Sequence, residues 1–542
     1  MKRIGMLLGL AAGLTLTGPT LALAQVPVSP DVTAAFATYQ RITLIVSLAA
    51  PEPATAQAIR DRQQAVIDAI GPDLAVDTRY ATIPALAVQV TAAGLAALQA
   101  HPLVTSIAPN RQFSTSATTS SGALALAPAP IDPARAEGLP VGSLTPAARQ
   151  GDTRSGLAAP QATRPPAPNA STALAQPANL RVIGAPAVWG AGHVGAGQFV
   201  AVLDSGIEAS HPAFAGKTIV EGCFSQNDPA NRNFSLCPGR AVAAAGPGTA
   251  SACPDSNIVE SCVHGSHVAG IATGNDPAAG VYGVAPQADV IAIQVFHRMW
   301  DTERNRWDIR TNSVDWLAGL DFVANLAQAN PGKIASANMS LGGARIGTFC
   351  DDLFEAGADV INRLRDLRVS TVIAAGNDEY RGDIAFPACL SPAMAVAATD
   401  QNDVFSDNAG TNLANFPLVF MAAPGDLILS AIPGHRYARF SGTSMATPMV
   451  AGALAVLHSA YPGYQTFDYE TALARTGKPV ILDGAYRLPR LDLTVADAML
   501  AGNVSGGSLS QPYSPSSPVA YIQSPARGND AWSLYKWQLY VP

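Results

Sequence analysis

Charged residues are scarce in this chain of 542 residues: Asp, Glu, Lys and Arg make up only 13%, against 48% hydrophobic residues. The net charge is −7, and no basic stripe runs along the sequence. A nucleic-acid partner is therefore not expected, because such proteins concentrate Lys and Arg on one face. The apolar content excludes global disorder and is ample for a large core. The length exceeds that of one ordinary domain.

After its first residues the chain also lacks any uninterrupted apolar run of 18 residues, so we expect no membrane span in the mature protein. Residues 1–24 have the pattern of a secretory signal peptide. Lys2 and Arg3 precede an apolar stretch, and Ala22-Leu23-Ala24 form a small-x-small cleavage site. A transmembrane anchor is the alternative interpretation. We expect a secreted protein, either extracellular or periplasmic, and a monomer.

The six cysteines lack the C-x₂-C spacing of common zinc sites, which disfavours zinc. An even number of cysteines in an exported protein favours disulfides instead. Six cysteines allow many pairings, and we expect bonds between successive ones along the chain. The expected pairs are Cys223–Cys237, Cys253–Cys262 and Cys350–Cys389.

Residues 41–113 have the order of a small α+β sandwich. The apolar runs RITLIVSL, ALAVQV and VTSIAP alternate with stretches of helical periodicity, which indicates a βαββαβ order. Residues 114–178 are instead rich in Ser, Thr, Ala and Pro and contain no aromatic residue. Such a composition cannot bury a core and predicts an extended, mobile linker.

Residues 179–500 alternate between strand-like and helical patterns. Five continuous apolar runs are separated by helical stretches such as 313–329 and 353–366; the runs are GQFVAVLD, ADVIAIQVF, KIASANMSL, VSTVIAA and PAMAVAA. Strands buried on both faces and separated by helices predict a parallel α/β sheet with helices on both faces. Chemistry in such sheets is found where the strands end.

Several polar residues stand at these strand ends or at helix starts. Asp204 closes the run FVAVLD, and His264 begins the small-residue helix HGSHVAG. His267 completes an H-x-x-H pair without the rest of a metal motif, so we expect it in the core or packed behind the site residues. Asn377 follows the strand end AAG. Each of these residues also has a purely structural interpretation as a turn or cap residue.

Ser444 lies at the start of a buried helical pattern, FSGTSMATPMVAG. One interpretation is a helix cap, for which Ser and Thr are favoured. The other is a nucleophile, because the N-terminus of a helix stabilises a developing oxyanion. The second interpretation requires a base, an acid and an oxyanion donor elsewhere in the chain.

The motifs DSGI, HGSHVAG, AAGN and GTSMATPMVAG, in this order, resemble those of the subtilisin-like serine peptidases, or subtilases, over roughly residues 180–500. The resemblance implies a parallel-sheet α/β catalytic domain, preceded by a small α+β, ferredoxin-like pro-domain that inhibits the enzyme intramolecularly. The implied organisation is a signal peptide (1–24), an inhibitory pro-domain (25–113), a linker (114–178), a peptidase domain (179–500) and a disordered tail (501–542), for which a docking segment is the alternative.

The resemblance also assigns roles to single residues. Asp204 would orient His264, the general base, and Ser444 would be the nucleophile. The amide of Asn377 and the Ser444 N–H would stabilise the oxyanion. One wall of the substrate-binding cleft would consist of Ser340, Leu341, Gly342 and Gly343, and the opposite wall of Ala375 and Gly376.

The implied function is that of a secreted serine endopeptidase, made as a self-inhibited precursor and acting on protein or peptide substrates without a catalytic cofactor or catalytic metal. Phe420 stands where many members carry an acidic calcium ligand, so calcium is not expected there; structural calcium elsewhere is compatible with the sequence but has no site that we can place. Asp378, directly after Asn377, could favour substrates with basic side chains at the mouth of the specificity pocket. The insertion 222–262 is expected to be a loop near the cleft.

Two other functions compete with this one. A catalytically silent relative could serve as a binding module, although such a protein would be expected to lack one of the three catalytic residues. A dedicated processing protease would instead cut one partner protein, recognised by the inserted loop or the tail.

Overall fold

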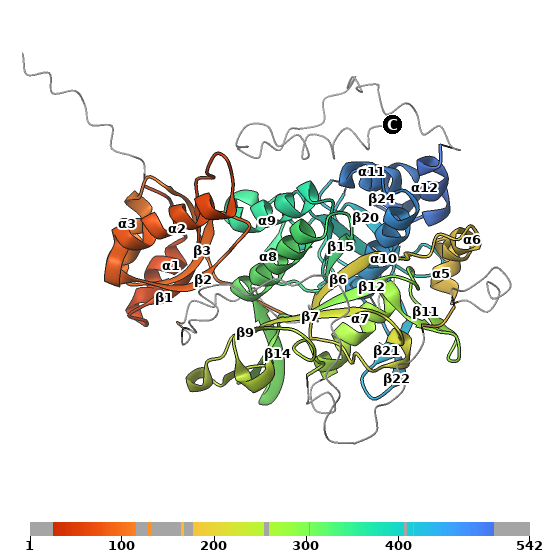
Figure 1. Cartoon of the computed structure of the whole chain (residues 1–542), viewed down its shortest axis with the longest axis horizontal. Helices are drawn as coiled ribbons and strands as arrows, with labels where there is room; N and C mark the ends of the chain where they lie inside the picture. Colours follow the sequence, from red (N-terminus) through yellow and green to blue (C-terminus); the bar gives the residue numbers. More distant parts are fainter. Residues whose placement is uncertain are drawn as a thin grey trace, which may run out of the picture.

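The computed structural model describes residues 25–114, 128, 131, 164–166, 177–253, 260–302, 304–405, 409–415 and 417–502. The expected signal peptide, nearly all of the expected tail and most of the expected linker lie outside these residues. No helix in the described part of the chain is long and apolar enough to cross a bilayer. In Figure 1 the N-terminal unit lies at one end of the molecule, beside α8 and α9 of the larger body.

The N-terminal unit has the expected βαββαβ order, and its antiparallel sheet has the strand order β2-β3-β1-β4. Thr55 and Thr91 cap its two longer helices by accepting a backbone N–H. The elements are α1 (Pro30–Ala34), β1 (Ile42–Leu48), α2 (Ala56–Ile70), β2 (Leu74–Arg79), β3 (Ala85–Val90), α3 (Ala92–Ala100) and β4 (Val104–Pro109).

The two faces of this small sheet bury apolar residues in different places. Leu44 and Val46 of β1 face the unit's own helices. Ile45 of β1, with Ala85 and Ala87 of β3, belongs instead to a hydrophobic cluster shared with the larger body. The shared cluster follows from the period-two alternation of side chains along each strand.

The larger body is built on a ten-stranded sheet in which eight neighbouring strands, from β24 to β7, are parallel. The five predicted runs form β6, β12, β15, β17 and β19, and every residue in them is buried. The strands in spatial order are β23 (Lys478–Leu482), β24 (Tyr486–Arg490), β20 (Met421–Pro424), β19 (Met394–Thr399), β17 (Ser370–Ala374), β15 (Ile334–Met339), β6 (Phe199–Asp204), β12 (Asp289–Gln294), β7 (Ile219–Phe224) and β9 (Ala243–Ala245).

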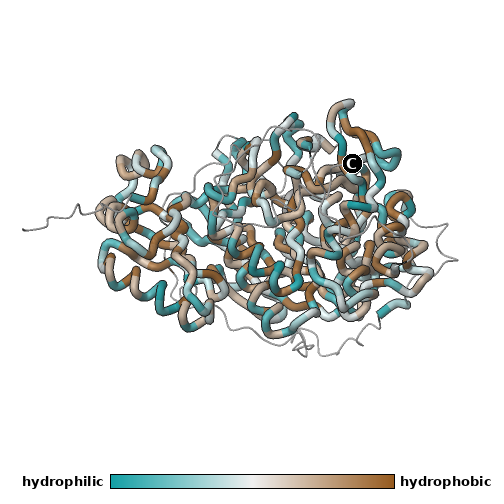
Figure 2. Tube along the Cα trace, turned by 90° about the horizontal axis from the view of Figure 1, so that it is seen from above, coloured by the Kyte–Doolittle hydropathy of each residue, from teal (hydrophilic) through white to brown (hydrophobic). Residues whose placement is uncertain are grey.

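Helices cover both faces of this sheet, as the sequence predicts. Leu203 of β6 points to the face with α8 and α9, whereas Val202 points to the face with α7 and α10. Figure 2 shows hydrophobic segments running through the interior of the body. The helices are α5 (Ala178–Val182), α6 (Ala185–Gly190), α7 (His264–Thr273), α8 (Ser313–Ala329), α9 (Glu355–Asp366), α10 (Thr443–Ala460), α11 (Thr466–Thr476) and α12 (Leu493–Leu500).

Several short antiparallel pairings were not expected from the sequence. β7 and β9 belong to the main sheet, so the insertion that we expected to be a loop contributes strands. The remaining strands are β5 (Gln112–Phe113), β8 (Asn233–Ser235), β13 (His297–Asp301) and β14 (Arg306–Asn312) in one sheet, and the pairs β10 (Asn275–Asp276) with β11 (Val281–Tyr282), β16 (Arg345–Ile346) with β18 (Ile384–Ala385), and β21 (Ile428–Ile432) with β22 (Arg436–Phe440).

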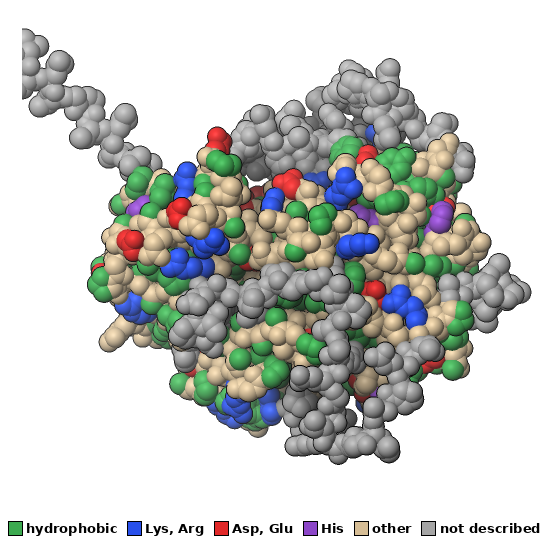
Figure 3. Space-filling view, in the orientation of Figure 1, with side chains coloured by type: hydrophobic (Ala, Val, Ile, Leu, Met, Phe, Trp, Pro, Cys, Tyr) green, Lys and Arg blue, Asp and Glu red, His purple; other side chains and the backbone are tan. Residues whose placement is uncertain are grey.

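The structure forms the three expected disulfides. On the face shown in Figure 3, basic side chains are scattered among acidic and apolar ones. Two described parts of the expected linker lie against the larger body. Ser114 pairs with Gly342, and residues 164–166 bind near the start of β12.

Candidate active site

A buried aspartate–histidine pair lies at the carboxyl end of β6. Both carboxylate oxygens of Asp204 are 2.9 Å from Nδ1 of His264, and only 1% of Asp204 is exposed. The Ser205 N–H donates to Asp204 Oδ1, and Ser205 Oγ accepts from the Gly265 N–H at 3.0 Å. Ser205, which the sequence reasoning did not single out, therefore fixes the end of β6 to the start of α7.

The position after His264 has no room for a side chain, which explains the glycine there. A Cβ at this position would lie 2.3 Å from the Gly206 carbonyl oxygen. The close approach lets His264 reach the carboxylate of Asp204. Because Nδ1–H donates to that carboxylate, Nε2 is left as a proton acceptor. Nε2 is buried and has no hydrogen-bond partner among the described residues.

Ser444 is the second residue of α10 and is 3% exposed. Pro448, four residues later, has no N–H, so the Ser444 carbonyl lacks its helical partner. That carbonyl accepts a hydrogen bond from Ser340 Oγ at 2.9 Å. In return, Ser444 Oγ donates to the Ser340 carbonyl at 3.4 Å. The two serines thus fix the loop after β15 to the start of α10.

Asn377 is held against the same helix start. Its Oδ1 accepts from the Thr443 N–H at 2.7 Å and from Thr443 Oγ1 at 2.8 Å. An atom that contacts two donors must be the amide oxygen, so the other terminal atom of the side chain is the nitrogen of the NH₂ group. Nδ2 donates no hydrogen bond in the part of the chain described. A Cβ on Gly442, whose φ is 150°, would lie 3.1 Å from Nδ2, so glycine keeps space open beside this donor.

The helices that carry His264 and Ser444 pack directly on each other. A Cβ on Gly452 of α10 would lie 2.8 Å from the Ala272 carbonyl of α7. The structure brings Asp204 to His264, but it does not hydrogen-bond Ser444 Oγ to His264 Nε2. Catalytic hydrogen bonds are often long without substrate and tighten when it binds.

The two expected walls of the cleft are joined by β18. The Ala385 N–H donates to the Ala375 carbonyl, and the Gly343 N–H donates to the Phe386 carbonyl. The methyl group of Ala385 lies 3.0 Å from a Cβ placed on Gly342 and 2.8 Å from one placed on Gly376. Both glycines therefore leave room for Ala385, a wall residue that the sequence reasoning missed. Leu341 itself is buried in the shared core.

His267 lies in the core, as expected. Burial lowers the pKa of His267 to about 3, with a smaller opposing effect of its hydrogen bond to the Ala438 carbonyl. Its ring stacks on Phe440, with 4.3 Å between the ring centroids. Among the described residues, no group of His, Cys, Asp and Glu is arranged to hold a metal ion. Phe420, the expected replacement of a calcium ligand, is fully buried.

An aspartate–histidine pair, a serine at a helix N-terminus and a nearby amide donor are the groups that a serine hydrolase needs. Comparison with known proteins identifies the class. The family described as "Subtilase family" matches residues 195–492, which is more than half of the chain. The chain therefore belongs to the subtilase family, and it is a serine-type endopeptidase.

Curated relatives agree with this assignment. An intracellular serine protease of Paenibacillus polymyxa is 31% identical over 285 residues, covering 52% of this chain and 72% of the relative. Thermitase of Thermoactinomyces vulgaris is 31% identical over 305 residues, covering 56% of this chain and 89% of the relative. Subtilisin E of Bacillus subtilis (strain 168) is 28% identical over 309 residues, covering 55% of this chain and 65% of the relative.

The first prediction concerns Thr443, which the sequence reasoning also missed. Thr443→Val removes the hydroxyl that holds Asn377 Oδ1 but keeps the volume. We expect kcat to fall about tenfold with KM little changed, because Asn377 would act only on the developing oxyanion. Thr443→Ser keeps the hydroxyl and should retain most activity. Steady-state kinetics on a peptide ester, with melting curves to check folding, measures both; an unchanged kcat in Thr443→Val would contradict the prediction.

The second prediction concerns Asp378. Burial raises the pKa of Asp378 to about 6, against a weaker opposing effect of the Asn412 amide. The side chain is therefore neutral at pH 5 and charged at pH 8. We expect the ratio of kcat/KM for a lysine substrate to that for a leucine substrate to rise about threefold between these pH values. Effects of pH that are common to both substrates cancel in this ratio. Asp378→Asn should make the ratio independent of pH, and a flat ratio in the wild type would refute the idea.

Proposed function

We propose that this chain is a secreted serine endopeptidase, made as a precursor that its own N-terminal unit inhibits. Ser444 Oγ attacks the substrate carbonyl and gives its proton to His264 Nε2, which Asp204 orients. Asn377 Nδ2 and the Ser444 N–H stabilise the oxyanion. The protonated His264 then gives the proton to the leaving amine, and water hydrolyses the acyl-enzyme.

The observation that carries the precursor proposal is the path of residues 112–114. β5 pairs antiparallel with β14, with Phe113 opposite Thr311. Ser114 exchanges two backbone hydrogen bonds of 3.3 Å with Gly342, on the expected cleft wall. The segment therefore lies between β14 and the loop after β15, in the extended conformation in which a peptide adds to a sheet edge. This path supports the proposal that the segment occupies the cleft as a substrate strand would.

Phe113 anchors this segment. Its side chain is fully buried. The ring stacks on Phe386, with 5.5 Å between the ring centroids, and meets Trp316 edge-on at 6.5 Å. Burying a phenylalanine side chain stabilises a complex by roughly 2–3 kcal/mol before any ring–ring contribution. A single aromatic side chain therefore accounts for much of the attachment of this segment.

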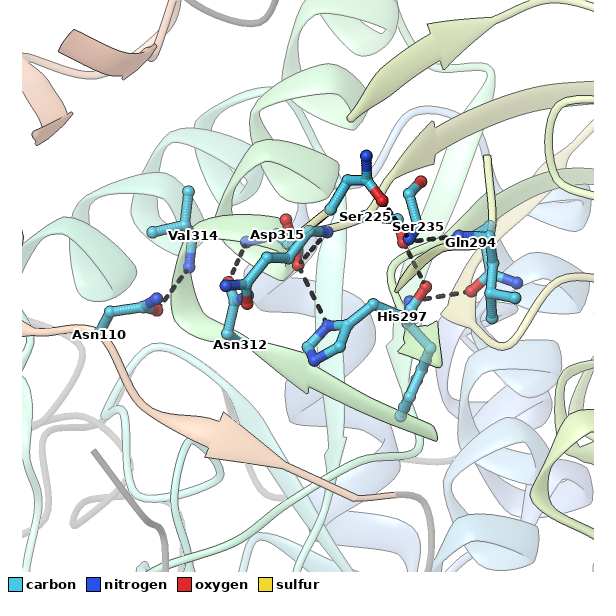
Figure 4. A network of polar contacts seen from close by, with 12 residues as sticks. Asn110, Ser225, Ser235, Gln294, His297, Asn312, Val314 and Asp315 are labelled. Carbon is cyan, nitrogen blue, oxygen red and sulfur yellow. Dashed lines mark hydrogen bonds and ion pairs between the residues drawn. The ribbon is translucent and has the colours of Figure 1, made fainter. Parts of the chain in front are cut away.

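The N-terminal unit also satisfies the free N–H groups at the start of α8. The Ser313 N–H donates to the Arg111 carbonyl at 2.9 Å, and the Val314 N–H donates to Asn110 Oδ1 at 3.3 Å. Figure 4 shows the second contact, next to the network that joins Asp315 to Asn312 and His297. Because the first turn of a helix has no internal acceptors, these bonds favour the docked state.

Asp321, further along α8, makes a second polar contact with the N-terminal unit. Its carboxylate accepts bonds of 2.8 Å from the N–H groups of Ala81 and Thr82, and one of 2.5 Å from the Thr82 hydroxyl. Burial raises the pKa of Asp321, and these three bonds act in the opposite direction. The unit is thus held at two places, the loop between β2 and β3 and the segment 110–114 that follows β4.

Secretion is supported by the leader-like start of the sequence and by three disulfides, which persist in oxidising compartments. Two of the related proteases are named as intracellular. The disulfides support a different location for this chain, because disulfides are rare inside cells. The silent binding module is set aside because the chain is an endopeptidase. No observation favours a dedicated processing protease over a broader one.

The third prediction tests the nucleophile and the precursor together. Wild type and Ser444→Ala are secreted and compared by size on one gel. We expect the wild type to shorten from the 55.7 kDa chain to the peptidase, and Ser444→Ala to lose only its signal peptide. If both shorten alike, another protease removes the N-terminal unit and self-cleavage is wrong.

The fourth prediction tests inhibition by the docked segment. In the self-cleaved but undissociated enzyme, Phe113→Ala should raise the dissociation constant of the N-terminal unit about 100-fold or more, because a buried aromatic side chain is lost. The readout is the protein concentration at which half of the activity appears on dilution. Tyr39→Ala removes an aromatic side chain that is 37% exposed and should leave this concentration unchanged. Identical dilution curves for Phe113→Ala and wild type would exclude the proposed anchor.

A further inference from the structure

Residues 164–166, an Arg-Pro-Pro segment that we call the strap, lie in the region expected to be a free linker. The Arg164 guanidinium reaches three acceptors on the peptidase body. Nε donates to the Gly216 carbonyl at 3.3 Å, and Nη1 donates to the Gln287 carbonyl at 2.8 Å. Nη2 pairs with the carboxylate of Asp289. The pair is largely shielded, with the two side chains only 25% and 12% exposed.

The two prolines are held by side-chain amides. Gln287 Nε2 donates to the Pro165 carbonyl at 3.0 Å. Asn275 Nδ2 lies 3.2 Å from the same carbonyl and 3.4 Å from that of Pro166. Asn275 is itself buried. These contacts use the carbonyl groups of the prolines, which are the only backbone hydrogen-bonding groups that proline has.

The body is shaped to receive the strap. A Cβ on Gly216 would lie 2.2 Å from the backbone nitrogen of Arg164. Gly216 also has a φ of +70°, which favours glycine. Any side chain at this position would push the strap away from the surface.

The strap joins three separate parts of the peptidase body. Gly216 precedes β7, and Gln287 and Asp289 lie at the start of β12. Asn275 belongs to β10, directly after the helix that carries His264. Two of these parts are the amino ends of the parallel strands β7 and β12, whereas the proposed catalytic groups lie at the carboxyl ends. The strap can therefore affect stability without touching the active site.

The charges around the strap are complementary. The Asp289 carboxylate faces both Arg164 and the neighbouring Lys217. Burial and, to a lesser extent, the charge of Arg164 lower the pKa of Lys217 to about 7, against the smaller opposing effect of Asp289. Lys217 Nζ donates to the carbonyls of Pro286 and Ala288. Asp289 is thus the one carboxylate among these groups, and Arg164 supplies a cation that binds it directly.

We propose that the strap is a permanent part of the peptidase and binds a socket formed by Gly216, Asn275, Gln287 and Asp289. The mature enzyme would then begin N-terminal to Arg164. The second part of this proposal rests on the proposed removal of the N-terminal unit. The two prolines also disfavour cleavage within the strap. Proline lacks the N–H group with which an extended substrate hydrogen-bonds to a protease.

A double-mutant cycle in the full-length Ser444→Ala chain tests the socket without any processing. We expect Arg164→Ala to lower the melting temperature by about 4 °C. In an Asp289→Asn background the same substitution should cost less than half as much, because the paired carboxylate is gone. Arg363→Ala, which removes an exposed arginine bonded to Gln328, is the matched control and should shift the melting temperature by no more than about 1 °C. Additive effects of the two substitutions would overturn the socket.

The start of the mature wild-type chain, read by mass spectrometry, tests retention. We expect it at or before Arg164; a stable, active product that begins after Pro166 would overturn the proposal. If no processing occurs at all, the precursor proposal fails, but the double-mutant cycle still decides whether the strap is bound.

Discussion

One backbone carbonyl group, that of Ser444, links the start of α10 to the expected wall of the cleft. Pro448 leaves the Ser444 carbonyl without a partner inside α10, and Ser340 supplies the missing donor. A buried carbonyl without a partner would cost roughly 1–3 kcal/mol, so this bond is strongly favoured. It fixes the loop that follows β15, and that loop presents Gly342 to Ser114. The position of the proposed nucleophile and the path of a bound strand are therefore set by the same contact.

The parallel sheet was predictable because strands buried on both faces produce continuous apolar runs, as in β6 and β19. The starts of α7 and α10 were predictable from their motifs, and the cysteine pairs from their spacing. The hairpin of β13 and β14 was not. Its strands carry several arginines and aspartates, including the buried ion pair of Arg310 with Asp308, and no apolar run marks it. Residues 164–166 gave no signal either, because a composition typical of linkers does not reveal three residues that bind.

The residues missed in the site share one property: their role depends on contacts between distant segments. Thr443 looks like a helix-start residue, yet its hydroxyl holds Asn377. Ala385 is an ordinary small residue in sequence, yet it lies between two glycines, Gly342 and Gly376, that belong to different strand ends. In the sequence, Phe113 marks the end of a small domain. Only the structure shows that its ring packs among aromatic side chains of the peptidase body. Local patterns indicate chemistry well, but they do not indicate which surfaces meet.

In the proposed precursor, the shared hydrophobic cluster would make the separation of the two units one-way. Ile45, Ala85 and Ala87 are covered only while the N-terminal unit sits on the peptidase body. Once it detaches, one face of its four-stranded sheet is wetted, and the unit retains only the small core beneath its two helices. A sheet left with a bare apolar face would unfold readily and become a substrate for the enzyme that we propose it inhibits. Activation would then consume its own inhibitor, so that each molecule can be switched on only once.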